Sequence, residues 1–184
     1  MKTKITNIST ISTWSPKKNK LVSYNDVEIL VEDSIIIQIS NSVGGADMEI
    51  DADGALITPG FVDSHTHPIF SGNRAGEFGM RVAGKSYEKI ASEGGGIISS
   101  INRIRDASED RLFDECLERV NFFLAHGTTT IEAKSGYGLS TKDELKSLRV
   151  IKRLNEVSNL DIVPTFMGAH AFPHEYENNH NDYV

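Results

Sequence analysis

Phe61-Val62-Asp63-Ser64-His65-Thr66-His67 begins as an apolar strand and ends in a polar segment with two histidines. Alternate side chains of a strand share one face, so His65 and His67 are expected to point the same way and to reach one metal ion. A bare pair of histidines two residues apart also arises by chance or on a solvated loop. Because an apolar strand comes first, the stretch favours a metal-binding pair at the C-terminal end of a buried strand.

The chain after this stretch alternates strands with helices. Two further strands are predicted at Thr128–Ala133 and Asp161–Met167, and each leads into a polar loop. Between the strands, apolar residues recur at helical spacing from Ile97 to Ile104, from Leu112 to Leu124 and from Leu145 to Leu154. Strands that alternate with helices of this length indicate a parallel α/β architecture with right-handed crossovers.

Local signals mark the ends of the predicted helices. Ser108 can cap the second helix, and Gly127 supplies its stop. Thr141-x-x-Glu144 is predicted to be a capping box that opens the third helix. A closed (β/α)8 barrel takes roughly 200 to 250 residues, so about three β/α units, the first part of a TIM-type barrel, are expected in residues 57–184.

The first 56 residues are predicted to form a small β domain. Val27–Val31 and Ile35–Ile39 are β-branched runs separated by three polar residues, which is the pattern of a hairpin. Another short extended piece lies around Met48–Ile50. We therefore expect residues 1–56 to be an incomplete, composite, β-sandwich-like domain that precedes a truncated barrel in residues 57–184.

Composition excludes several classes of protein. The 184 residues carry a net charge of −7, which argues against binding to nucleic acid, because no basic cluster could neutralise a row of phosphates. The one basic run, Lys17–Lys20, is expected to be a solvated loop. No apolar run approaches the ~18 residues of a membrane span. Cys116 has no cysteine to pair with and is expected to be a buried helical thiol, which fits a cytoplasmic protein.

The histidine pair lies within a longer signature. This signature resembles the opening of the amidohydrolase superfamily and reads Asp53-Gly54-x-Leu56-Ile57-x-Pro59-Gly60-Phe61-Val62-Asp63-x-His65-x-His67. Four further motifs are similar in order and approximate spacing to the imidazolonepropionase family, over residues 55–176: Phe70-Ser71-Gly72-Asn73-Arg74, Glu93-Gly94-Gly95-Gly96-Ile97, Ala133-Lys134-Ser135-Gly136-Tyr137-Gly138-Leu139 and Phe166-Met167-Gly168-Ala169-His170-Ala171. The glycine triplet lacks the Gly-Lys-Ser/Thr of a phosphate loop and is expected to let a loop pass close to the pocket.

The resemblance implies a reaction and a metal. The family hydrolyses 4-imidazolone-5-propanoate to N-formimino-L-glutamate during L-histidine breakdown, with a water activated by one zinc or iron ion. His65 and His67 would be two of its ligands, whereas another histidine, an aspartate and the acid/base residues would lie beyond residue 184. The chain is thus expected to be the N-terminal part of a longer hydrolase, with no catalytic acid or base of its own, weak metal binding and little activity.

The resemblance also implies three substrate-binding residues. Arg74 would hold the propionate carboxylate through two parallel charge-assisted bonds, although by itself it is equally an exposed arginine in a loop. Tyr137 lies between two glycines, which suits either a phenol presented to a ligand or a packing anchor. His170 follows the third strand, where it could also be a core histidine bonded to the backbone.

Other functions stay open, because one fold supports many reactions. The chain could belong to another cyclic amidohydrolase, or to an aminohydrolase for a purine or pyrimidine whose substrate has no carboxylate for Arg74 to hold. It could also be a short non-catalytic binding module. For an enzyme, the expected partner is the small-molecule substrate, and a homodimer is a further expectation for the full-length protein.

Overall fold

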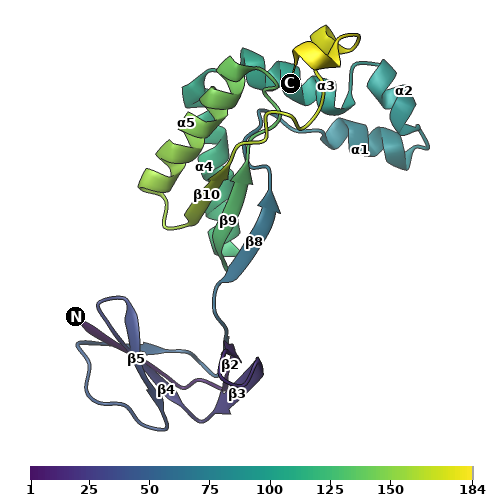
Figure 1. The fold of residues 1–184 in the computed structure, drawn as a ribbon. Coiled ribbons are helices and arrows are strands. Elements are labelled where there is room, and N and C mark those ends of the chain that lie inside the picture. The colour runs from purple at the N-terminus through teal and green to yellow at the C-terminus, as the bar shows by residue number, and fades with distance from the viewer. Residues whose placement is uncertain (184) are drawn as a thin grey trace. The chain divides into compact units, whose positions relative to one another are not determined.

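The computed structural model describes residues 1–183 and has a mixed α/β fold (Figure 1). The chain divides into two compact units, Met1–Pro59 and a second unit that begins at Gly60. The first unit is built from strands, and the second alternates strands with helices. The predicted α/β class is confirmed at this level.

The first unit contains two sheets. One has the strand order β5-β4-β1-β6 and the other has the order β3-β2-β7. The last strand, β7, pairs in parallel with β2, so the chain rejoins the second of these sheets immediately before the second unit begins. The strands are β1 (Lys2–Thr6), β2 (Thr10–Ser15), β3 (Lys20–Asn25), β4 (Glu28–Glu32), β5 (Ile35–Ser40), β6 (Met48–Asp51) and β7 (Leu56–Ile57).

The hairpin predicted from the β-branched runs is confirmed. Strands β4 and β5 pair antiparallel, and the turn between them places Asp33 and Ser34 at φ values of 46° and 69°. Positive φ at both central residues is what a type I′ hairpin turn requires, and the twist of this turn matches that of the flanking strands. The extended piece predicted near Met48 is also present, as β6.

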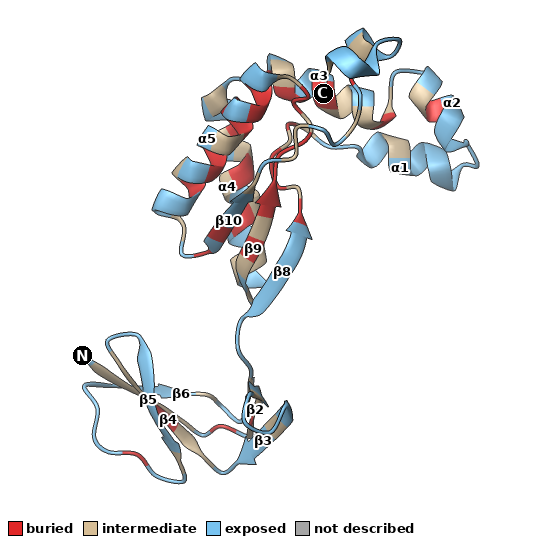
Figure 2. Ribbon diagram, viewed as in Figure 1, coloured by how far each residue is buried: buried red, intermediate tan, exposed pale blue. Residues whose placement is uncertain are grey.

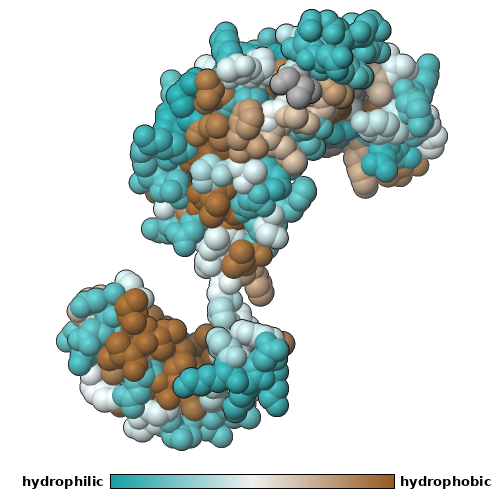
Figure 3. All heavy atoms as spheres, viewed as in Figure 1, coloured by the Kyte–Doolittle hydropathy of each residue, from teal (hydrophilic) through white to brown (hydrophobic). Residues whose placement is uncertain are grey.

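A small apolar core holds the first unit together. Its buried centre is formed by Ile8, Ile11 and Ile29. Strand β5, by contrast, exposes apolar side chains, and Figure 3 shows an apolar area on the surface of this unit. The exposed isoleucines of the strand are Ile35, Ile36, Ile37 and Ile39. Neighbouring exposed apolar side chains of this kind are typical of an interaction surface.

The second unit is built on a three-stranded sheet in the order β10-β9-β8. Both strand pairs are parallel, as the alternation of strands and helices predicted. The strands are β8 (Phe61–Thr66), β9 (Thr128–Lys134) and β10 (Asp161–Thr165). The helices are α1 (Ala75–Val82), α2 (Tyr87–Ser92), α3 (Gly96–Asp106), α4 (Glu109–Ala125) and α5 (Thr141–Val157). None of the helices in residues 1–183 is long and apolar enough to span a membrane.

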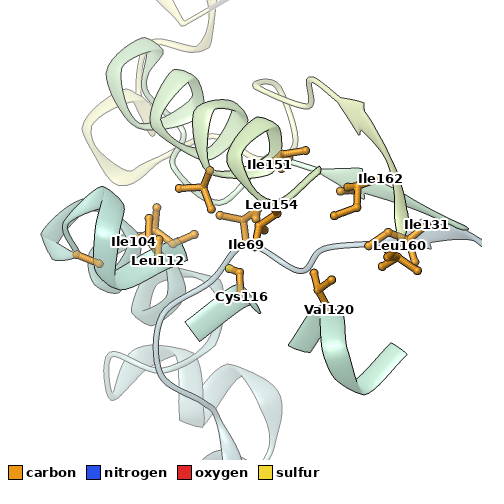
Figure 4. Close-up of a cluster of buried hydrophobic side chains, with 13 residues drawn as sticks. Ile69, Ile104, Leu112, Cys116, Val120, Ile131, Ile151, Leu154, Leu160 and Ile162 are labelled. Atoms are coloured by element: carbon orange, nitrogen blue, oxygen red, sulfur yellow. The ribbon is translucent and has the colours of Figure 1, made fainter. Parts of the chain in front are cut away.

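Helices α4 and α5 pack on each other and on the sheet, with α4 against β9 and α5 against β10. Their facing side chains form the main core, which Figures 2 and 4 show in red and as sticks. Helix α4 begins as predicted, because the Ser108 hydroxyl accepts a hydrogen bond from the Arg111 backbone N–H at 3.1 Å. It also stops as predicted, just before Gly127, whose φ is +82°.

Cys116 lies in this core and is expected to be inert in the folded chain. Its side chain is fully buried and its thiol donates to the Pro68 carbonyl at 3.2 Å. Burial raises the pKa of the thiol to about 11, so at pH 8 only roughly one molecule in a thousand carries the reactive thiolate. Ellman's reagent at pH 8 should therefore label Cys116 only after urea unfolds the chain. Rapid labelling of the folded chain would contradict this burial.

Helices α1 and α2 were not predicted from the sequence. No residue of α1 is buried, and Gly76 and Gly79 both lower the propensity of its sequence for a helix. The eight residues of α1 are also fewer than those of the helices that were recognised from apolar residues at helical spacing. Strand β10 is also shorter than predicted, since it ends at Thr165 and leaves Phe166 and Met167 in the loop that follows.

Candidate functional site

The C-terminal ends of the three parallel strands meet at one edge of the sheet. His65 lies near the end of β8 and His67 just beyond it, while the loops after β9 and β10 carry Tyr137 and His170. The Thr66 hydroxyl donates to the Glu132 carbonyl at 2.7 Å and ties the end of β8 to β9. Four of the five predicted site residues are therefore delivered to this edge by the sheet.

The two histidines have a spacing that suits one metal ion. Their ring centroids lie 5.7 Å apart, with the ring planes at 57°. Two imidazoles on a tetrahedral ion would place their centroids roughly 5 Å apart, because each Zn–N bond is about 2 Å long. Nδ1 of His67 is buried and has no hydrogen-bond partner within residues 1–183. A buried nitrogen without a partner is the kind of group that a bound ion satisfies.

The surroundings of His67 favour its neutral form, which is the form that binds metals. Burial lowers the pKa of His67 from its ordinary value, and the nearby imidazoles of His170 and His65 lower it further. Across the described part of the chain, however, no group of three or more His, Cys, Asp or Glu side chains is arranged to hold an ion. The pair fits two positions of a metal shell and does not complete one.

Tyr137 and His170 join His67 in one aromatic cluster. The His67 ring lies 5.0 Å from the Tyr137 ring, with 25° between the planes, and 5.0 Å from the His170 ring. The Tyr137 and His170 rings are 5.6 Å apart. His170 is exposed, so it is not the buried core histidine that the sequence left open. The aromatic cluster thus brings together residues that follow three different strands.

Gly136 allows the two loops to approach each other this closely. Its φ is +108°, a region that L side chains rarely adopt. A Cβ atom added at this position would lie 2.9 Å from both the Met167 carbonyl oxygen and the His170 Cβ. A larger residue would therefore strain the backbone and push His170 away from Tyr137.

The buried carboxylate of Glu144 holds the loop that carries Tyr137. It accepts three backbone hydrogen bonds of 2.8 Å, from Gly136 and from Gly138 and Leu139. The predicted capping box at Thr141 is wrong, because Glu144 bonds to this loop and not to the start of the helix. Ser140 caps α5 instead, and its hydroxyl accepts from the Asp143 backbone N–H at 3.2 Å.

Arg105 holds the same loop from its carbonyl side. Its guanidinium donates to the Gly138 carbonyl at 2.8 Å and to the Leu139 carbonyl at 2.9 Å. It also pairs with Glu175 at 2.7 Å. A carboxylate thus binds the N–H groups of the loop and a guanidinium binds its carbonyl groups, so the backbone on either side of Tyr137 is fixed.

Arg74 and the aromatic cluster face one pocket. The pocket has a volume of about 280 Å³. It is lined by His67, Phe70, Ser71, Asn73, Arg74, Ser100, Arg103 and Tyr137. Three of the five predicted site residues, His67, Arg74 and Tyr137, therefore line the same cavity. His65 and His170 lie beside it through their contacts with the His67 ring.

The segment between the histidines and Arg74 is fixed to α4. Arg119 donates to the Pro68 carbonyl at 3.0 Å and to the Phe70 carbonyl at 2.7 Å. Glu115 accepts from the Gly72 backbone N–H at 2.9 Å and from the Ser71 hydroxyl at 3.2 Å. These polar groups hold a loop with no secondary structure of its own at the rim of the pocket.

Sequence reasoning missed the charged residues that support the site. Glu144, Arg105 and Glu77 were given no role there, although each contacts a segment that carries a predicted site residue. Only Glu77 left a local signal, because it stands three residues after Arg74, the spacing of a helical ion pair. The contacts of the other two residues span loops and helices that the sequence does not place together.

Comparison with curated proteins finds many similar chains named imidazolonepropionase. The chain is 43% identical over 166 residues to the protein of Haloarcula marismortui, a match that covers 86% of this chain and 40% of the relative. It is 45% identical over 177 residues to that of Brevibacillus brevis, with 91% and 42% covered. For Shewanella sediminis the identity is 53% over 131 residues, with 71% and 32% covered. The chain thus spans about a third to two fifths of the length of these relatives, and no family model matches it.

Solved structures with the same fold are amidohydrolases and related hydrolases. A zinc complex of atrazine chlorohydrolase from Arthrobacter aurescens aligns with a TM-score of 0.58 at 14% identity, covering 89% of this chain and 35% of that one. A prolidase aligns with a TM-score of 0.53 at 15% identity, with 90% and 32% covered. Identities this low show the fold alone.

Proposed function

We propose that this chain, as a member of the imidazolonepropionase family, forms part of an enzyme of histidine breakdown. The enzyme would hydrolyse 4-imidazolone-5-propanoate to N-formimino-L-glutamate. The observation that carries the proposal is the single pocket lined by His67, Arg74 and Tyr137. The substrate has a planar polar ring and a carboxylate at the end of a short chain. The pocket combines aromatic rings and a guanidinium at different points of its wall, which suits both parts of such a molecule.

His65 and His67 would hold the metal ion. A bound zinc or iron ion would supply an activated water and would polarise the ring carbonyl. Imidazole nitrogens suit both metals, and the buried unpartnered nitrogen and lowered pKa of His67 support its role as a neutral donor. The remaining ligands and the catalytic acid and base would come from outside residues 1–183, and the isolated chain would bind metal weakly and turn over little substrate.

Arg74 and the aromatic pair would bind and orient the substrate. The Arg74 side chain is 45% exposed and lines the pocket, so its guanidinium can donate two parallel hydrogen bonds to a carboxylate. Tyr137 and His170 stand against the His67 ring and would fix the position of the imidazolone ring beside it. Their part in the reaction is to orient the ring for attack, which lowers the entropic barrier.

The finer architecture is proposed together with the function. The three parallel strands and their helices would be the first three units of a (β/α)8 barrel in residues 57–184. The two small sheets would be part of a composite β-sandwich-like domain in residues 1–56. The similarity in fold to whole amidohydrolases, of which the chain covers about a third, supports this arrangement.

The proposal is tested by measuring the turnover of 4-imidazolone-5-propanoate. The protein to assay is the enzyme that the gene encodes. The Arg74→Ala variant should lower kcat/KM by about a hundredfold or more, because two charge-assisted bonds to the substrate carboxylate are lost. The matched control is Arg81→Ala, which removes an exposed arginine at the other end of α1 and should leave turnover unchanged.

The same assay separates the other functions. A purine or pyrimidine aminohydrolase would prefer a substrate without a carboxylate, and Arg74→Ala would not affect its turnover. Preferential hydrolysis of another cyclic amide would also refute the assignment. A non-catalytic module would turn over none of these substrates, and gel filtration with metal analysis would show the 184-residue chain as a stable species that carries a stoichiometric metal ion.

A further inference from the structure

We propose that Glu77 is a positioning residue that aims the guanidinium of Arg74 into the pocket and thereby sets the preference of the pocket for carboxylate ligands. The inference deepens the proposed function, and it rests on Arg74 being the group that binds the carboxylate of the ligand. It concerns the residue that holds Arg74, not a residue that itself touches the ligand.

One oxygen of Glu77 collects three donors. Oε2 accepts from Arg74 Nε at 2.8 Å, from Arg74 Nη2 at 2.7 Å and from the Gly96 backbone N–H at 3.1 Å. The Glu77 side chain is 14% exposed, whereas that of Arg74 is 45% exposed. Exposed ion pairs contribute little, but this carboxylate is largely shielded from water and is anchored by the backbone of another element. It can therefore fix a side chain that is otherwise mobile.

The geometry of the guanidinium explains how Glu77 can hold Arg74 without blocking it. A guanidinium offers five N–H donors in a planar fork. Glu77 occupies the edge formed by Nε and Nη2, and within residues 1–183 Nη1 of Arg74 has no hydrogen-bond partner. The edge formed by Nη1 and Nη2 thus remains available, and its two parallel donors match the two oxygens of a carboxylate.

The glycine triplet at residues 94–96 supplies the backbone that binds the Glu77 carboxylate. Gly96 donates its N–H to Glu77 at the start of α3. A Cβ atom at Gly95 would lie 2.9 Å from the Ile90 carbonyl oxygen and 3.3 Å from the carboxyl carbon of Glu77. Glycine at position 95 therefore allows the backbone to pack against the carboxylate, and this assigns the triplet a function in supporting Arg74.

Charges around the pair keep Glu77 ionised. The hydrogen bond from Arg74 holds the pKa of Glu77 below its ordinary value, and the charge of Arg103 acts in the same direction. At neutral pH the pair is therefore a carboxylate and a guanidinium. The loss of the carboxylate would leave Arg74 charged but free to adopt other rotamers.

Nuclear magnetic resonance of the 15N-labelled 184-residue chain tests the inference without relying on activity. The readouts are the exchange rate of the Arg74 Nε–H with water and the affinities for imidazole-4-propanoate and 4-propylimidazole, which differ in the carboxylate. In Glu77→Ala, exchange should accelerate by about tenfold or more, and the preference for imidazole-4-propanoate should fall by about tenfold. Glu77→Gln keeps an acceptor without the charge and should give intermediate values. Glu88→Ala removes an exposed carboxylate of α2 and should change neither readout.

Each outcome supports or overturns the inference. An Arg74 signal that is the same in both Glu77 variants as in the parent chain would overturn it. Tighter binding of imidazole-4-propanoate by Glu77→Ala would overturn it as well, because Glu77 would then compete with the ligand. Glu77→Gln provides the test if Glu77→Ala fails to fold. If the enzyme that the gene encodes binds neither compound while the Arg74 signal still depends on Glu77, the positioning contact is confirmed and the proposed function fails.

Discussion

Replacing Glu144 by alanine should lower the free energy of unfolding of the second unit by about 3 kcal/mol or more. The carboxylate is almost fully buried and accepts three backbone N–H groups, from Gly136 and from Gly138 and Leu139. Each buried donor left without a partner costs about 1 to 3 kcal/mol, and water that enters the space recovers part of this. Urea denaturation followed by circular dichroism measures the loss, which corresponds to a fall in melting temperature of roughly 10 °C.

Two variants of the same helix show whether the three hydrogen bonds cause this loss. Glu156→Ala removes an exposed carboxylate from α5 and should change stability little. Glu144→Gln keeps one acceptor oxygen but turns an N–H₂ group toward one of the backbone donors, so its stability should lie between those of the parent and Glu144→Ala. Equal stability of Glu144→Ala and Glu156→Ala would show that the carboxylate does not hold the loop.

Replacing His67 by alanine should have the largest effect on metal binding. Zinc bound by a four-ligand site gains about 10 to 16 kcal/mol, so one ligand of such a site is worth roughly a hundredfold in affinity. His67 is also the ring that Tyr137 and His170 contact, so its loss removes the centre of the aromatic cluster. The zinc affinity of the encoded enzyme, measured by competition with a chromophoric chelator, should fall by about this factor. Turnover by the encoded enzyme should fall at least as far.

His174→Ala is the matched control for this experiment. The His174 side chain is 81% exposed and lies outside the pocket, so zinc affinity and turnover should both stay at the level of the parent protein. Unchanged zinc affinity in His67→Ala would contradict a metal role for the histidine pair. A fall of equal size in both variants would indicate zinc bound at random by surface histidines.

The parts of the fold that were predicted correctly have local causes. The hairpin of β4 and β5 follows from two β-branched runs and a short polar turn, and α4 follows from an apolar stripe between Ser108 and Gly127. Helix α1 was missed because it is only eight residues long and contains two glycines, so its sequence gives little signal for a helix. The capping box was assigned to the wrong residues because the helix begins one residue earlier, with Ser140 as its cap, and Glu144 binds the backbone of the loop that precedes the helix.

The sequence likewise predicted some residues of the candidate site and missed others. The sequence identified His65 and His67 because strand periodicity places them together, and the resemblance to a family supplied Arg74, Tyr137 and His170. The spacing of Arg74 and Glu77 allowed an ion pair between them, but the sequence gave no sign that Glu77 also binds the Gly96 backbone at the start of α3. It also gave no sign that Arg105 and Glu144 bind opposite polar groups of one loop. The contacts of Glu77 with Gly96 and of Arg105 with Gly138 join residues 19 and 33 positions apart, and like those of Glu144 they are made to backbone groups that carry no side-chain signal.

By itself, the sequence determined the alternation of strands and helices, the histidine pair and the resemblance to a family. These depend on residue type and short-range spacing, which a chain carries in any conformation. Only the tertiary structure decided which loops meet, that His67, Arg74 and Tyr137 line one pocket, and which buried charges support them. The physical reason is that buried charges and backbone donors must find partners once water is excluded, and only the packed fold determines which partners are near enough.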